Sequence, residues 1–202
     1  MNFSIYIRPL EIEDAKVSYH WRNNPKIWRF TGFKAKHPIT LEIETAWLTD
    51  VLKRDDEKRF AICTKEEDRY IGNVHFANIK GTTAEAHVFI GDMKYWGNDR
   101  AYDAICLLLE YGFEKMGLDT VLIDINAKNN ASLSLGKKLG FIEQVRYYDQ
   151  KTTFDLVRSV FTKEMYENRA HFNSKHDTNN SIKSLIVEQP VLYVNEKLGQ
   201  AS

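Results

Sequence analysis

Residues 89–104 have the residue types and the order of an anion-binding turn. A strand-like pattern ends at Ile90, a short turn contains Gly97, and apolar residues at helical spacing begin near Arg100. The N–H groups in the first turn of a helix have no partner inside the helix, and they bind phosphate oxygens. Gly97 lets a ligand approach the backbone closely, and Arg100 adds a positive charge. This order predicts a phosphate site, although a glycine in such a turn more often has a structural role.

A second candidate site lies in residues 129–141, which follow an apolar strand-like run. Asn129 precedes a helical pattern in which Ser132 is a first-turn residue, and Gly140 marks the end of that helix. In the simplest interpretation Asn129 and Ser132 only start the helix. The alternative, that they contact a ligand, stays open.

Glu85 and His87 are two residues apart in a strand-like run, so their side chains point to the same face. Such a pair could take a proton from an amine, although a histidine in a strand is more often a packed or surface residue. The six histidines are His20, His37, His75, His87, His171 and His176. None of them pairs with another at the spacing of metal ligands, so we expect no metal.

Composition places the chain among ordinary globular domains. It has 202 residues with 28 Lys plus Arg and 28 Asp plus Glu, so its formal net charge is zero. A zero charge excludes a basic field for nucleic acid or an anionic membrane, and leaves only a local patch open. Residues 104–109, the longest strongly apolar run, are far too few to span a bilayer. Cys63 and Cys106 lie in apolar runs outside any CxxC pair, and the first residues do not resemble a signal peptide. We therefore expect free buried thiols and a cytoplasmic protein.

Apolar patterning predicts an α/β fold with a mixed, mostly antiparallel sheet. Strands are expected at residues 3–7, 59–64, 70–79, 84–90, 121–125, 141–148 and 154–161. Helices are expected at residues 10–22, 40–52, 99–117, 131–139 and 162–169. Asn23, Asn24 and Pro25 should stop the first helix, so an aromatic and cationic loop is expected at residues 27–38.

The composition changes after Arg169. Residues 171–184 are polar without periodicity, and two short apolar runs follow, separated by Pro190. Proline cannot continue a central strand, so these runs do not predict a second domain. We expect one main domain over residues 1–170 and a C-terminal tail over residues 171–202, a linker plus a short apolar segment. The tail should pack on its own domain or on a neighbouring subunit of a homodimer.

Together, the two candidate sites resemble the GNAT N-acetyltransferase superfamily. Its first motif, (Gln/Arg)-x-x-Gly-x-(Gly/Ala), lies over Lys94-Tyr95-Trp96-Gly97-Asn98-Asp99. Its second motif, Asn-x-x-Ser followed by Leu-Gly-Phe, is close to residues 129–141. A resemblance to the branch of ribosomal-protein N-terminal acetyltransferases, which also holds amino-sugar and antibiotic acetyltransferases, comes from Trp21-Arg22-Asn23-Asn24-Pro25, Trp47-Leu48, Tyr111-Gly112-Phe113 and Gly117-Leu118. The resemblance covers about residues 5–168.

The resemblance implies that acetyl-CoA lies in a V between two splayed parallel strands, residues 84–90 and 121–125. The pantetheine arm would pair with the backbone of residues 88–90, and the pyrophosphate would lie on the N–H groups of residues 97–101. The implied cofactor-binding residues are Val88, Phe89, Ile90, Trp96, Gly97, Asn98, Asp99, Arg100, Ala101 and Asn129. The implied reaction is direct acetyl transfer to a primary amine: a peptide N-terminus, an amino sugar or a small amine.

Two residues depart from the family pattern. Asp99 replaces a glycine or alanine, and its charge would repel a pyrophosphate unless the side chain turns away or caps the helix. Gly136 replaces a tyrosine that protonates the leaving thiolate in many members. Ser132, one helical turn earlier on the same face, is then the expected acid, with Tyr147 and Tyr148 in reserve. Glu85 or His87 is the expected base.

These departures keep other hypotheses open. The chain could be a catalytically inactive GNAT-fold acyl-CoA sensor or protein-interaction module. A nucleotide-binding domain is disfavoured, because neither a GxGxxG motif nor a Walker lysine is present. For the enzyme, the cations in residues 28–34 suit an anionic acceptor such as a nucleotide-linked amino sugar, whereas the branch resemblance points equally to a peptide N-terminus.

Overall fold

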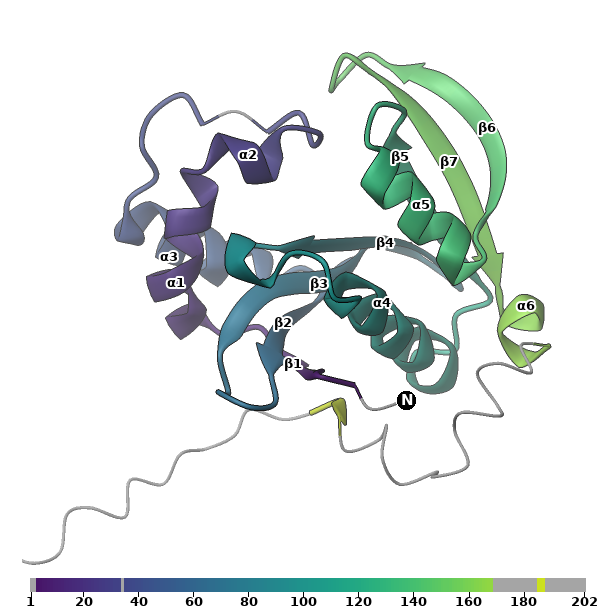
Figure 1. Cartoon of the computed structure of the whole chain (residues 1–202), viewed down its shortest axis with the longest axis horizontal. Helices are drawn as coiled ribbons and strands as arrows, with labels where there is room; N and C mark the ends of the chain where they lie inside the picture. Colours follow the sequence, from purple (N-terminus) through teal and green to yellow (C-terminus); the bar gives the residue numbers. More distant parts are fainter. Residues whose placement is uncertain (1–2, 34, 169–184, 188–202) are drawn as a thin grey trace, which may run out of the picture.

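The computed structural model describes residues 3–33, 35–168 and 185–187, and one mixed sheet forms its centre (Figure 1). The strand order is β1-β2-β3-β4-β5-β7-β6. The strands are β1 (Ile5–Pro9), β2 (Lys58–Thr64), β3 (Tyr70–Lys80), β4 (Thr83–Ile90), β5 (Thr120–Asn126), β6 (Ile142–Asp149) and β7 (Phe154–Thr162). In this sheet β4 and β5 are parallel, and the other neighbouring strands are antiparallel. The predicted α/β fold is confirmed.

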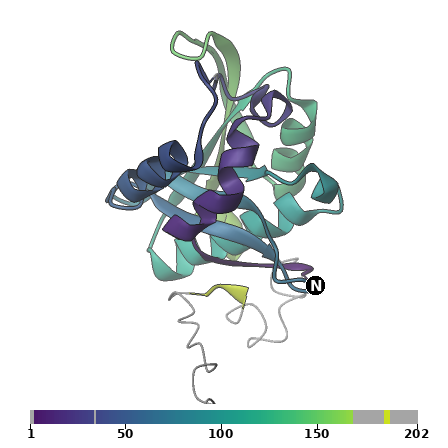
Figure 2. The same cartoon turned by 90° about the vertical axis from the view of Figure 1, so that its left-hand side faces the viewer.

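Helices cover both faces of the sheet. They are η1 (Ile12–Asp14), α1 (Ala15–Arg22), α2 (Pro25–Trp28), α3 (Leu41–Val51), η2 (Met93–Tyr95), α4 (Arg100–Glu110), η3 (Tyr111–Lys115), α5 (Asn130–Leu139) and α6 (Lys163–Glu167). Because successive strand residues point to opposite faces, β2 separates the two layers. Phe60 and Ile62 pack in the core with α4 and α5, whereas Ala61 and Cys63 pack with α1 and α3. Figure 2 brings α1 and α3 to the front.

The first helical region differs from the prediction in its details. The predicted helix over residues 10–22 starts with the short 3-10 turn η1, and α1 follows it and ends at Arg22 as expected. Pro25, however, begins α2 instead of opening a loop. Proline fits the first position of a helix because its missing N–H would have no partner there. The Asn24 side chain caps α2 by accepting a hydrogen bond from the Lys26 N–H at 3.1 Å.

The two central parallel strands separate soon after they begin. Their register pairs Thr83 with Thr120, Ala84 with Val121 and Glu85 with Leu122. Beyond Glu85, β4 continues to Ile90 along β3, while β5 continues along β7. The β5-facing edge of β4 is therefore free of strand partners past Glu85, and the predicted V-shaped splay is confirmed.

Three residues of the C-terminal tail are described, and they pack beside β1. Ile186 forms a parallel bridge with Ile7, and the Val187 N–H donates to the Ile7 carbonyl at 2.9 Å. Leu185 is buried in the larger core cluster. The remainder of the predicted tail, and Lys34 of the predicted loop, lie outside the described residues. Within the described part of the chain, no helix combines the length and the apolar character needed to cross a bilayer.

Candidate active site

The turn before α4 has the geometry of an open anion site. Gly97, Asn98 and Asp99 all adopt positive φ angles of 80°, 52° and 56°, which is the left-handed region. A Cβ built on Gly97 would meet no atom within 4 Å, so the space beside this backbone is open. The predicted phosphate site therefore has both the conformation and the room that close approach of a ligand needs.

The carboxylate of Asp99 turns away from this site. Its Oδ1 accepts from Lys138 Nζ of α5 at 2.7 Å, and the side chain makes no capping hydrogen bond to α4. The N–H groups in the first turn of α4 are thus not capped by Asp99 and can receive phosphate oxygens. Of the two arrangements that would relieve repulsion, the structure has the first: the side chain turns away.

Arg100 places a positive charge with unsatisfied hydrogen-bond donors at the same turn. Its guanidinium lies 5.0 Å from the ring centroid of Tyr95. Its Nε and Nη1 atoms are sealed from solvent and have no hydrogen-bond partner among the described residues. Unpaired buried donors are costly, so an anion at this turn would relieve that cost. The open turn and these donors fit the pyrophosphate of coenzyme A.

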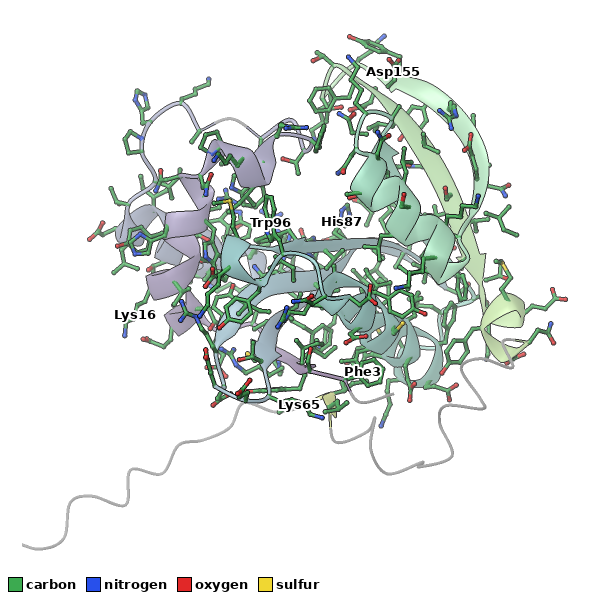
Figure 3. The ribbon with its side chains drawn as sticks, in the orientation of Figure 1. Phe3, Lys16, Lys65, His87, Trp96 and Asp155 are labelled. Atoms are coloured by element: carbon green, nitrogen blue, oxygen red, sulfur yellow. The ribbon has the colours of Figure 1, made fainter. Side chains whose placement is uncertain are left out.

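Trp96 lies at the open end of β4, where Figure 3 places its label. Its indole N–H donates to the Ile90 carbonyl at 2.8 Å, and the side chain is 48% exposed. The Ile90 carbonyl, expected to pair with pantetheine, thus has a partner already. On the same strand Val88 packs toward α4, whereas Phe89 points to the opposite face and contacts Trp21.

Asn129 caps α5, as the simplest interpretation predicted. Its Oδ1 accepts from the Ser132 N–H at 3.3 Å, while its amide nitrogen makes no hydrogen bond within the described residues. Ser132 is half-buried in the first turn of the helix. Ala101 in the first turn of α4 packs against the core. Asn129 and Ser132 therefore lie together at one helix start, and a ligand role for either stays a prediction.

The face of β4 opposite α4 carries His87, whose position is marked in Figure 3. His87 pairs across the strands with His75, and their rings stack with centroids 4.8 Å apart. Burial lowers the pKa of His87, while Glu85 partly opposes this effect. Yet 41% of the His87 side chain is exposed. The ring is therefore partly packed against protein and partly open to solvent.

Glu85 lies beside His87 but does not bond to it. The His87 Nε2 to Glu85 Oε2 distance is 3.9 Å, too long for a hydrogen bond. Glu85 instead accepts from Asn78 Nδ2 at 2.7 Å and lies 3.5 Å from Arg158 Nη2. The predicted pair thus shares a face, and His87 is the member whose ring remains free for a substrate proton.

Sequence reasoning missed Asp124 and Arg158. Arg158 Nε donates to Asp124 Oδ1 at 2.9 Å, and the Tyr147 hydroxyl donates to Asp124 Oδ2 at 2.9 Å. Asp124, Arg158, Tyr147 and Glu85 form a polar network across β5, β7, β6 and β4. The network lies where the parallel pairing of β4 and β5 ends, at Glu85 and Leu122. Asp124 is the charged residue in the otherwise apolar run 121–125, and this contrast is the sequence feature that could have identified it as a site residue.

Tyr147 and Tyr148 point to opposite faces of β6 because they are adjacent. Tyr147 joins the network through Asp124, whereas Tyr148 is 60% exposed. The structure therefore brings the first of the two reserve tyrosines to the His87 face and not the second. Within the described part of the chain, no group of three or more His, Cys, Asp or Glu residues could hold a metal ion.

The loop after α2 meets the turn between β6 and β7 above this face. A Cβ built on Gly32 would lie 3.1 Å from the Cβ of Thr152, so the two segments are in contact. Thr152 is fixed in turn by Asp149, which accepts from its backbone N–H at 2.8 Å. In Figure 1, α2 and the turn between β6 and β7 face one another above β4. The two contacting segments therefore limit the directions from which an acceptor would reach His87.

Known proteins match this architecture. A family model described as an acetyltransferase (GNAT) domain matches residues 4–142. The chain is 30% identical over 147 residues to the probable N-acetyltransferase YjcK of Bacillus subtilis, covering 68% of this chain and 80% of the relative. It is 27% identical over 140 residues to the spermidine N(1)-acetyltransferase of Escherichia coli K12, covering 68% and 73%.

Solved structures agree with the fold. Spermidine N-acetyltransferase from Vibrio cholerae, in complex with CoA and spermine, superposes with a TM-score of 0.73 at 20% identity, over 83% of this chain and 100% of that one. These comparisons support the superfamily but not the expected ribosomal-protein branch, because the relatives whose names state a substrate act on spermidine. The family model spans more than half of the chain. The chain belongs to the GNAT acetyltransferase family, and it is an N-acetyltransferase with acetyl-CoA as its acyl donor.

Proposed function

We propose that this N-acetyltransferase transfers an acetyl group to a primary amine that binds over His87, by direct attack in a ternary complex. The observation that carries this proposal is the free edge of β4 beyond Glu85. At one end this edge leads to the open turn at Gly97, and on one face it carries His87. A donor along the edge and an acceptor on the face would meet at the strand.

The donor side needs only backbone and cationic groups. The N–H groups of residues 97–101 and the Arg100 guanidinium would hold the pyrophosphate. The free backbone edge of Val88 would pair with the pantetheine arm as an added strand does. These contacts fix the thioester in place and so lower the entropic cost of bringing two reactants together.

The acceptor amine must lose a proton before it attacks the carbonyl carbon. His87 is the base that we favour, because partial burial lowers its pKa and keeps the imidazole neutral at neutral pH, while 41% of the side chain stays exposed. Glu85 is the weaker candidate, since Asn78 and Arg158 already occupy its oxygens. As the C–N bond forms and the C–S bond breaks, the thiolate needs a proton. Ser132 is the proposed donor, and Tyr147 is the reserve.

The finer acceptor class is open to test. Spermidine is the substrate stated for two relatives at 27% identity, so a small polyamine is one candidate. Amino sugars and peptide N-termini remain the others from the sequence. A homo-oligomer is also proposed, since one similar structure is described as dodecameric. We further propose a cytoplasmic location, because Cys63 and Cys106 are buried and neither is in a disulfide.

The test is turnover of the full-length chain with acetyl-CoA and a panel of amines, amino sugars and peptides. Thiol release that depends on the amine, with acetylation of that amine by mass spectrometry, is the expected result. Coenzyme A binding without turnover on any member would instead support the acyl-CoA sensor hypothesis. Absence of coenzyme A binding would contradict the donor site itself.

A further inference from the structure

Arg22 at the end of α1 is enclosed by aromatic rings. Its guanidinium lies 4.3 Å from the ring centroid of Phe33, 4.7 Å from that of Trp47 and 5.4 Å from that of Trp28. The side chain is only 16% exposed. Cation–π contacts of this kind favour a guanidinium over the flat faces of aromatic rings. We call these four residues the Arg22 subsite.

The donors of Arg22 are unsatisfied. Among the described residues none accepts a hydrogen bond from it, and its Nε is sealed from solvent. Glu44 Oε2 lies 3.6 Å from this Nε, and its other oxygen accepts from Ser18 Oγ at 2.7 Å. Glu44 is almost completely buried, so its carboxylate compensates the positive charge of Arg22 from the protein interior. The Nη1 and Nη2 atoms of Arg22 are not sealed from solvent, so they are the donors that reach the surface.

The Arg22 subsite lies next to the proposed acceptor face. The Trp28 ring packs against Phe89 at a centroid distance of 4.9 Å, and its indole N–H donates to the Trp21 carbonyl at 2.7 Å. Phe89 follows His87 by two residues on the same face of β4. Two residues along a strand span about 7 Å. Phe89 and Trp28 thus connect the His87 face to Arg22, and an acceptor with its amine at His87 would lie along these two rings to place its remote end at Arg22.

Among the described residues, Arg22 has only the 3.6 Å ion pair with Glu44, whereas Arg59 and Arg158 of this face donate hydrogen bonds to their partner carboxylates. Arg59 forms an ion pair with Glu57, and Arg158 is held by Asp124. Arg22 differs from both because its outer donors have no acceptor in the described part of the chain. A planar guanidinium with open donors fits a carboxylate or a phosphate and repels an ammonium group.

We propose that Arg22 binds an anionic group of the acceptor, so the substrate is a small amine that also carries a carboxylate or a phosphate. This rests on the proposed function and names the substrate class of the same site. It predicts a preference opposite to that of a polyamine acetyltransferase, in which the remote end of the substrate is cationic.

The experiment compares pairs of amines that differ in the remote charge. Glucosamine 6-phosphate is paired with glucosamine, and 6-aminohexanoate with its amide, with spermidine as the cationic probe. For the wild-type chain we expect kcat/KM for one or both anionic members to exceed that of the neutral partner by roughly 10- to 100-fold, as for a hydrogen bond to a charged group. The two pairs distinguish phosphate from carboxylate as the favoured anion.

Arg22→Gln should reduce that preference to about one, mainly through KM. Arg22→Lys should keep part of it, because the charge remains while the planar fork is lost. Arg29→Gln is the matched control: Arg29 is exposed on the same segment and lies over Phe30, and its loss should leave the preference unchanged. Thermal melting checks that each variant folds.

Several results would overturn the inference. Equal or better turnover of spermidine and the neutral amines by the wild-type chain would do so while the proposed function stands. An equal loss on charged and neutral acceptors in Arg22→Gln would assign Arg22 a structural role. Coenzyme A binding without turnover of any probe would contradict the proposed function and this inference together.

Discussion

Gly136 of α5 lies directly against Ile123 of β5: a Cβ added to the glycine would stand 3.0 Å from Ile123 Cδ1. It would also meet Ile125 Cδ1 at 3.5 Å. Glycine therefore lets α5 approach the sheet closely at the position where many family members have the acidic tyrosine. Gly136 itself has no side chain that could protonate the leaving thiolate, so a general acid has to come from another position.

Ser132 is the position that we propose for the acid, and its substitution tests the assignment. Ser132→Ala should lower kcat by a factor of roughly 10²–10⁴, as is typical for a proton-transfer group, with little change in acetyl-CoA binding. The matched control is Ser134→Ala, which removes an exposed hydroxyl from the same helix. If Ser132→Ala keeps near wild-type kcat, the acid is elsewhere, and Tyr147→Phe is the next variant to measure.

The Asp99–Lys138 ion pair should control donor affinity. Lys138→Met releases the Asp99 carboxylate beside the phosphate site, and we expect coenzyme A affinity to fall about fivefold, from ~1 kcal/mol of added repulsion. The loss should shrink at high salt. Asp99→Asn combined with Lys138→Met should recover most of the affinity, and Lys137→Met serves as the charge control. Calorimetry gives each dissociation constant; no recovery in the double variant would mean that Lys138 itself contacts the donor.

Gly97 should tolerate no acidic side chain. Gly97→Glu places a negative charge in the open turn, and coenzyme A affinity should fall at least roughly tenfold. Gly81→Glu is the matched control, because Gly81 also has a positive φ of 58° and open space around it, but lies in the turn between β3 and β4. Both variants carry similar backbone strain, so only a difference in binding counts. Unchanged affinity in Gly97→Glu would show that the phosphate site is misplaced.

The fold could be predicted because local patterns are strong where elements are regular. Asn129 and Gly140 were recognised as the start and the end of α5 from their types alone, and both have those roles. Pro25 misled the prediction because proline both ends one helix and begins the next, and only the Asn24 cap decides between these outcomes.

The site could be predicted only where a motif is contiguous. The Gly97 turn lies within one short segment, whereas the Arg158–Asp124–Tyr147 network joins three strands through side chains alone. Cross-strand register determines such contacts, and register depends on the whole sheet. The direction of the Asp99 carboxylate likewise depends on Lys138, which is far away in the sequence.

The tail should stabilise the domain without taking part in donor binding. Leu185 is 6% exposed beside β1, so Leu185→Ala should lower the free energy of unfolding by roughly 2–3 kcal/mol. Removal of all residues after Arg169 should destabilise by at least as much and leave coenzyme A affinity unchanged. Denaturant unfolding and calorimetry measure the two effects. Loss of binding in a truncated chain that is still folded would place the tail in the donor site.

The pH dependence of the reaction should reveal His87. Burial lowers the pKa of His87 below 6.5 and that of stacked His75 well below it, and Arg59 lowers the pKa of His75 further. A base that is neutral above its pKa gives a rate that rises with pH and levels off, so the rising limb of kcat/KM should lie below pH 6.5. His87→Phe should remove that limb, as should the double variant Glu85→Gln with His87→Phe. His75→Phe should shift it without removing it, because a ring still stacks on His87.

Stability provides an independent check on the same two histidines. A histidine whose folded pKa is depressed binds fewer protons than it does in the unfolded chain, so the free energy of unfolding falls as pH drops below about 6.5. Each such histidine contributes a slope of at most ~1.4 kcal/mol per pH unit. Replacing both with phenylalanine should flatten the stability curve between about pH 5 and 6.5. A flattened curve combined with an unaltered rate profile would show that the amine arrives already neutral, so that positioning of the two substrates carries the reaction.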